Sequence, residues 1–177
     1  MVPVVIRRLG AADVDVFREL RLESLRDAPT AFITDHADEA RMARDEFIAR
    51  LDRELVLGAE RSRRLVGIVG LQWQSGPKHS HRGQVWGLYV VPDCRRNGIS
   101  RQLMEALETE AARDLEVLDL EVVLDNEPAR CLYQQLGYTV YGLQSRALKI
   151  EGTYHDRLLM FKELMPARLR GNPSAAG

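Results

Sequence analysis

The sequence predicts a mixed α/β domain in which helices cover both faces of one central sheet. Short strand-like segments alternate with amphipathic helices along the chain. Residues 55–59 and 65–73 flank a charged turn, which predicts a hairpin. With 177 residues, of which 45% are hydrophobic, the chain is long enough to bury one substantial core. We therefore expect a single domain over residues 1–165, followed by a small, polar and basic tail over residues 166–177 that we expect to be flexible.

Hydrophobic periodicity and turn residues give the order of the elements. Strands are predicted at residues 4–7, 55–59, 65–73, 85–90, 117–123, 138–141 and 158–164. Helices are predicted at residues 13–26, at 34–51 with a break near 43–45, from about residue 98 onward, and at 127–136. Asp13 and Asn126 are suited to cap two of these helices. Gly67 and Gly70 weaken their strand but leave room on its face.

Composition excludes several functional classes. The formal net charge is −1, so the chain is no polycation and we do not expect it to bind nucleic acid. Cys94 and Cys131 lie far apart, and His79 and His81 have no further ligand nearby, so we expect no metal site. No apolar run approaches the ~20 residues of a membrane span. The N-terminal residues lack the order of a secretory signal, so we expect a cytoplasmic protein with no membrane partner.

The most informative segment runs from Gln84 to Arg113, where a strand, a short basic loop and an amphipathic helix follow one another. Arg95, Arg96 and Arg101 cluster at the start of the helix with no carboxylate between them in the sequence. The first turn of a helix has unpaired N–H groups and a partial positive charge, so this arrangement suits a bound anion. A solvated basic loop with an ordinary capping glycine is an equally acceptable interpretation of these residues alone.

Together with two other blocks, this segment resembles the GNAT superfamily of acyl-coenzyme A-dependent N-acetyltransferases. Leu88–Pro92 followed by Arg95–Ser100 is similar to the family's R/Q-x-x-G-x-G/A motif. Asn126–Tyr138 is similar to its N…A…LY…LGF block, and Leu20–Phe32 to its entry helix. Ser100 stands where the family has Gly or Ala, and Asn97 where it often has Gly or Lys; both leave the loop open. The resemblance covers roughly residues 4–165 and implies a mostly antiparallel sheet of about six or seven strands.

The resemblance also implies acetyl-CoA as co-substrate and a set of residues that bind it. Strand backbone would pair with the pantetheine arm, and the loop and helix N-terminus would hold the diphosphate. The residues assigned to this role are Leu88, Tyr89, Val90, Arg95, Arg96, Asn97, Gly98, Ile99, Ser100, Arg101, Asn126 and Tyr133.

Transfer of an acetyl group from a thioester to an amine requires a deprotonated amine, a polarised carbonyl and a proton for the leaving thiolate. By resemblance, Tyr133 is the phenolic acid, seven residues after Asn126, and the Val90 N–H is the oxyanion donor. Gln84 stands where some relatives carry a glutamate base. Glu121, five residues before Asn126, matches the base position of other relatives. A solvated strand carboxylate, with deprotonation by ordered water, explains Glu121 equally well.

The leading hypothesis is an N-acetyltransferase that acts on a primary amine of a small molecule or peptide by direct attack. The alternative is a non-catalytic acyl-CoA-binding sensor. A homodimer is conceivable from the family alone. We expect the acceptor to be selected by the entry helix, residues 32–51, the 74–83 loop and residues 143–156. The candidate lining residues are Arg21, Glu23, Asp35, Glu39, Trp73, Trp86 and His155.

Overall fold

The computed structural model describes residues 3–164, and the predicted C-terminal tail lies outside them. One seven-stranded sheet has the order β1-β2-β3-β4-β5-β7-β6, and only the β4–β5 pair is parallel. The strands are β1 (Val5–Arg8), β2 (Leu55–Arg61), β3 (Arg64–Trp73), β4 (Arg82–Val90), β5 (Val117–Val123), β6 (Thr139–Ile150) and β7 (Thr153–Glu163). This confirms the mixed, mostly antiparallel sheet that the sequence predicts.

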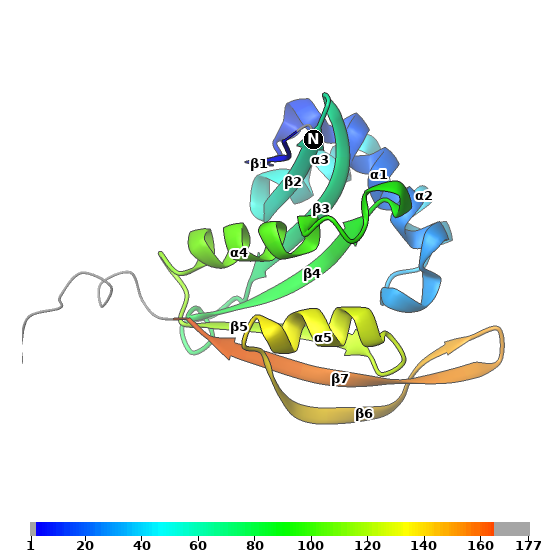
Figure 1. Ribbon diagram of the computed structural model, residues 1–177, viewed down its shortest axis with the longest axis vertical. Coiled ribbons are helices and arrows are strands. Elements are labelled where there is room, and N and C mark those ends of the chain that lie inside the picture. The colour runs from blue at the N-terminus through cyan, green and yellow to red at the C-terminus, as the bar shows by residue number, and fades with distance from the viewer. Residues whose placement is uncertain (1–2, 165–177) are drawn as a thin grey trace, which may run out of the picture.

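Helices cover both faces of this sheet, as predicted (Figure 1). They are α1 (Val14–Asp27), α2 (His36–Ala40), α3 (Arg44–Arg53), α4 (Ile99–Ala111) and α5 (Glu127–Gln135), with 3₁₀ turns at Ala11–Asp13, Pro29–Ala31 and Pro92–Cys94. Both α1 and α4 pack on β3, and every residue from Val66 to Leu71 is buried. A strand between two helical layers loses its polar face, which is why β3 is apolar from Leu65 to Leu71.

Two local predictions need correction. The expected strands at 138–141 and 158–164 are the ends of a much longer hairpin, β6–β7, which turns at Glu151–Gly152. Most of β6 is exposed, so its residues show no alternation of apolar and polar side chains that would reveal a strand. Asp13 precedes α1 as predicted, but its carboxylate binds Arg7 at 2.8 Å instead of capping the helix.

A glycine on β3 makes room for a tryptophan on β4. Gly70 and Trp86 are directly paired across the two strands. A Cβ built on Gly70 would lie 2.1 Å from the Trp86 Cε2 atom, so the indole occupies the space that a side chain would need. The room that the sequence predicts on this strand face is therefore filled by one aromatic ring.

We expect Gly70→Ala to lower the free energy of unfolding by about 1–3 kcal/mol, because the indole must leave its rotamer or the strands must separate. Urea denaturation followed by tryptophan fluorescence measures this loss. Gly10→Ala is the matched control: Gly10 has φ −135° and no atom within 4 Å of an added Cβ. Equal stability of the two variants would contradict the tight packing described here.

Candidate active site

The main cleft opens where β4 and β5 separate. These parallel strands pair only over Arg82–Gln84 and Val117–Asp119, although both continue further. On its other edge, β4 carries one extra residue: Ile68–Gly70 of β3 face Trp86–Tyr89. This is a β-bulge, and Gly87 within it has φ +69°, a conformation that favours glycine. Because a bulge bends its strand and increases the local twist, it accounts for the separation of β4 from β5.

The gap forms a cleft of about 520 Å³, and we call this cleft the β4–β5 cleft. It is lined by Ala28, Ala31, Phe32, Val85–Val90, Arg95, Arg96, Ser100, Leu120–Val122, Asn126, Pro128, Ala129, Leu132 and Tyr133. The backbone of β4 beyond Gln84 has no partner on β5. Exposed strand backbone of this kind can hydrogen-bond an extended ligand that carries amides.

At the end of the cleft, loop 95–98 leads into the N-terminus of α4. A cavity of about 290 Å³ lies here, against Gly98, Ile99 and Ser100. Gly98 is the N-cap of α4 with φ +74°. The Ile99 side chain is buried in the core, so Ile99 can contribute only its backbone N–H to a ligand. The Asn97 side chain donates to the carbonyls of Cys94 and Arg95, both at 3.2 Å, and therefore shapes the loop.

The three arginines of this region differ in their surroundings. Arg95 donates from Nε to the Val90 carbonyl at 2.8 Å and forms an ion pair with Asp27 of α1. Arg101 donates to Gln135 of α5 at 2.8 Å and lies 3.6 Å from Glu105. The sequence has no carboxylate between the three arginines, but the fold brings Asp27 to Arg95, and Glu105 lies one helical turn after Arg101.

Arg96 contacts no carboxylate among residues 3–164, and it lines both cavities of this region. Its φ of +62° is uncommon for a residue with a Cβ. Arg96 is therefore the arginine best suited to pair with an anionic ligand.

Tyr133 lies on α5 with its ring at the wall of the cleft and only 8% of its surface exposed. Burial raises the pKa of its hydroxyl well above the usual value for a phenol. The group therefore stays protonated at neutral pH and can donate a proton or a hydrogen bond. Asn126 caps the same helix as predicted, because its Oδ1 accepts from the Ala129 N–H at 3.3 Å.

Glu121 lies on β5 at the edge of the cleft. Its Oε2 lies 2.5 Å from Nη1 of Arg157 on the neighbouring strand β7, although the two groups are not aligned as a hydrogen bond. Its carboxylate is therefore paired with a cation at one oxygen. This arrangement fits both a positioned base and a structural ion pair.

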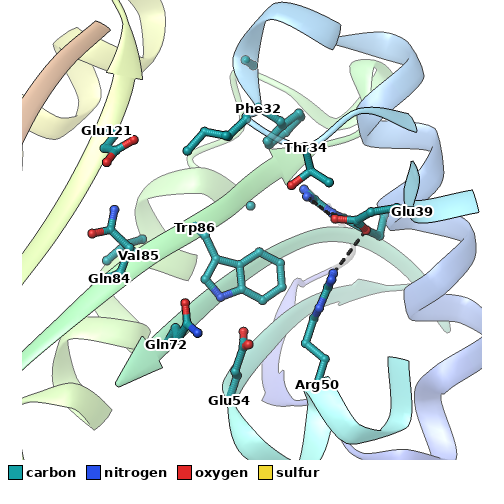
Figure 2. Close-up of a pocket in the computed structure, with 14 residues that line it drawn as sticks. Phe32, Thr34, Glu39, Arg50, Glu54, Gln72, Gln84, Val85, Trp86 and Glu121 are labelled. Atoms are coloured by element: carbon teal, nitrogen blue, oxygen red, sulfur yellow. Dashed lines mark hydrogen bonds and ion pairs between the residues drawn. The ribbon is translucent and has the colours of Figure 1, made fainter. Parts of the chain in front are cut away.

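A second cavity of about 390 Å³ adjoins the cleft, and we call it the Trp86 cavity (Figure 2). It is lined by Arg21, Ala31–Thr34, Glu39, Arg50, Glu54, Gln72, Gln84–Gly87 and Glu121. Figure 2 shows Trp86 near its centre, with Arg50 and Glu39 joined on one side and Glu121 facing Gln84 on the other. Its walls come from α1, α2, α3, the segment 31–34 and the strands β3, β4 and β5.

Two arginines stack against aromatic rings on one wall of this cavity. The Arg21 guanidinium lies 5.0 Å from the Phe32 centroid and 5.5 Å from that of Trp86. The Arg50 guanidinium also lies 5.5 Å from the Trp86 centroid. Glu39 is 1% exposed and bridges the two, at 2.8 Å from Arg21 and 3.2 Å from Arg50.

Charge in this wall is set by burial and pairing together. Burial alone would raise the pKa of Glu39, but hydrogen bonds and charges from Arg21 and Arg50 outweigh it, so the pKa lies below its usual value. For Glu54 the balance is reversed: burial raises its pKa above the usual value, although Arg50 acts in the opposite direction. Figure 2 shows the Glu54 carboxyl directed toward the Trp86 nitrogen, which has no aligned hydrogen-bond partner.

The structure places three of the predicted acceptor-lining residues, Arg21, Glu39 and Trp86, in the Trp86 cavity. The other four lie outside it: Glu23 near the Tyr89 hydroxyl, Asp35 at the N-cap of α2, Trp73 at the end of β3 and His155 beside Asp125. Sequence reasoning did not single out Arg50, Glu54 or Gln72. No local signal marks them, because isolated polar residues on α3 and β3 resemble ordinary surface residues.

Residues 3–164 contain no group of three His, Cys, Asp or Glu residues that could hold a metal ion. None of the helices in this part of the chain is long and apolar enough to cross a membrane.

Comparison with known proteins assigns the family. A sequence model of the acetyltransferase (GNAT) family matches residues 17–138. An N-acetyltransferase of unknown specificity from Archaeoglobus fulgidus is 31% identical over 131 residues, which cover 72% of this chain and 88% of that protein.

Solved structures share the fold. A GNAT-family acetyltransferase from Streptococcus pneumoniae superposes with a TM-score of 0.81 at 24% identity, covering 91% of this chain and 99% of that one. The Salmonella typhimurium protein yncA, a putative acetyltransferase solved with its cofactor acetyl-CoA, superposes with a TM-score of 0.80 at 22% identity. The match covers 98% of this chain and 99% of that one. The family model and the relative from Archaeoglobus fulgidus agree with the separated strands and the loop at the start of α4. The chain therefore belongs to the GNAT family of acetyltransferases.

Proposed function

We propose that this enzyme transfers the acetyl group of acetyl-CoA to a primary amine of a small molecule or peptide, with both substrates bound at once. The observation that carries the proposal is the wall shared by the two cavities. The β4–β5 cleft and the Trp86 cavity have in common Ala31, Phe32, Val85, Trp86, Gly87 and Glu121. A thioester in the cleft and an amine in the cavity would therefore meet beside Gly87 and Glu121, which suits direct attack.

The cleft has the features that acetyl-CoA requires. The unpaired backbone of β4 would hydrogen-bond the pantetheine amides, with the Val90 N–H as donor to the thioester oxygen. The N–H groups at the start of α4, with the Arg96 side chain, would hold the diphosphate. Arg95 would act indirectly, because its bonds to Val90 and Asp27 fix the end of β4 against α1.

In the reaction, the amine nitrogen forms a bond to the thioester carbon and the carbon–sulfur bond breaks. The amine proton passes to Glu121 or to water, and the thiolate receives a proton from the Tyr133 hydroxyl. The Tyr133 phenolate then regains, through solvent, the proton that the amine released. The products are the acetamide and free CoA thiol.

A screen for release of free thiol from acetyl-CoA, over amino acids, polyamines, aminoglycosides and N-terminal peptides, tests the proposal. We expect amine-dependent thiol release, together with binding of acetyl-CoA in calorimetry. Binding without release for every amine would favour the acyl-CoA sensor instead. Absence of binding at millimolar acetyl-CoA would overturn both hypotheses.

We expect Tyr133→Phe to lower kcat by about one to two orders of magnitude, with little change in the affinity for acetyl-CoA, because the phenolic proton is lost and the ring remains. Tyr138→Phe is the matched control, because its ring lies 5.8 Å from that of Tyr133 but does not line the cleft. Steady-state kinetics and calorimetry measure the two effects. An unchanged kcat in Tyr133→Phe, with chemistry limiting turnover, would remove this residue from the mechanism.

If Glu121 accepts the amine proton, Glu121→Gln should lower kcat/KM by about 100-fold or more, because an amide cannot accept that proton. Asp125→Asn removes an exposed carboxylate just beyond the same strand and should leave kcat/KM unchanged. Thermal melts control for the stability lost when Arg157 loses its partner. A kcat/KM of Glu121→Gln that matches the parent would assign deprotonation to water.

A further inference from the structure

The acceptor side of the site contains a buried cationic group with unused hydrogen-bonding capacity. Arg21 is 4% exposed, and its Nε and Nη2 atoms both donate to Glu39, at 3.1 Å and 2.8 Å in their shortest contacts. This fork-to-carboxylate arrangement satisfies one edge of the guanidinium. The Nη1 atom on the other side is buried and has no partner among the described residues. A buried donor left without a partner is costly, so such a group in a cavity wall indicates a ligand that completes it.

The unpaired Nη1 atom of Arg21 lies beside Gly87, where the proposed reaction would take place. A Cβ built on Gly87 would lie 3.6 Å from Nη1, so the atom faces the bulge of β4. Gly87 belongs to the wall that the Trp86 cavity shares with the β4–β5 cleft. A group bound at Nη1 would therefore lie close to an amine attacking the thioester.

The charges around Arg21 favour an anion at Nη1. Glu39 is shared between Arg21 and Arg50, so this trio carries one net positive charge. Glu121 is paired with Arg157, outside the trio. Glu54 is the remaining carboxyl of the cavity, and it faces the Trp86 nitrogen. The ring centroids of Phe32 and Trp86 lie 5.0 Å and 5.5 Å from the guanidinium carbon, so aromatic surface surrounds this charge.

We propose that the acceptor is a free α-amino acid or a close analogue, whose carboxylate binds Arg21 Nη1 while its amine faces the thioester. The inference rests on the proposed acetyl transfer and narrows its substrate class. The amine and the carboxylate would lie on either side of Gly87, with Glu121 beside the amine. The side chain of the amino acid would extend toward Trp86 and Gln72. A cavity of about 390 Å³ suits a small molecule of this kind.

The test compares neutral L-amino acids with their C-terminal amides, which keep the side chain and lose the negative charge. Because the two α-amines differ in pKa, each kcat/KM is expressed per concentration of unprotonated amine. We expect the parent enzyme to favour the acid in kcat/KM by at least about tenfold, from a charge-assisted hydrogen bond to Arg21. Arg21→Gln should reduce the ratio of acid to amide to near one. The ratio is taken within one protein sample, so partial unfolding of a variant does not alter it. Glycine, β-alanine and 4-aminobutyrate then test how far apart the amine and the carboxylate may lie, and glycine should be preferred.

Two further variants keep the test decisive. In Arg21→Lys the ammonium group can still pair with Glu39, but it has no second nitrogen that could reach the carboxylate of the substrate. This variant should fold normally and also lose the preference for the acid over the amide. Arg18→Gln removes the same charge from the same helix, outside the cavity, and should retain the preference. A parent ratio at or below one, or a ratio unchanged by Arg21→Gln, would overturn the proposal.

A binding measurement separates this proposal from the proposed function. N-acetyl amino acids and their amides are titrated in the presence of CoA. The acid should raise the melting temperature of the parent more than the amide does, and in Arg21→Gln the two should raise it equally. If no amine releases thiol but the acid still binds better, acetyl transfer fails and the carboxylate site stands. If amides, polyamines or peptides are acetylated as efficiently as free amino acids, acetyl transfer stands and the carboxylate site fails.

Discussion

The separation of β4 from β5 is the constraint on which the site depends. One extra residue in β4 opposite β3, with Gly87 at positive φ, bends the strand away from β5 after only three paired residues. Backbone groups that would otherwise complete the sheet are left at the wall of a cleft. The cost of unpaired backbone is offset when an amide-bearing ligand occupies the gap. The same bend turns Gly87 toward Arg21, so one local distortion shapes both cavities.

A second interaction holds one wall of the Trp86 cavity together. Glu39 and the two arginines that it bridges come from α2, α1 and α3, and they lie against Trp86 of the sheet. Buried ion pairs add little stability over apolar packing, but removal of one partner is strongly destabilising. The trio therefore fixes how the three helices sit over β4. The indole of Trp86 has its place only because Gly70 has no side chain.

The strand–loop–helix unit at residues 84–111 was predictable because its signals are local. Helical periodicity gave the buried stripe of α4, and Gly98 marked the start of the helix. The same applies to Asn126 as a cap and to the placement of Tyr133 on α5. The roles of the arginines were not predictable in this way. Arg95 is bound by Asp27, which lies 68 positions earlier in the chain, so only folding decides which of the three arginines contacts no carboxylate among residues 3–164.

The sequence by itself determined the family, the order of most elements and the strand–loop–helix unit that contains α4, since each follows from spacing within a short segment. Only the tertiary structure decided the length of the exposed β6–β7 hairpin, the membership of the Trp86 cavity and the pairing of its charges. The physical reason is that these features depend on partners brought together from distant segments. A side chain such as Arg50 or Glu54 acquires a role only through the burial and the neighbours that the fold supplies.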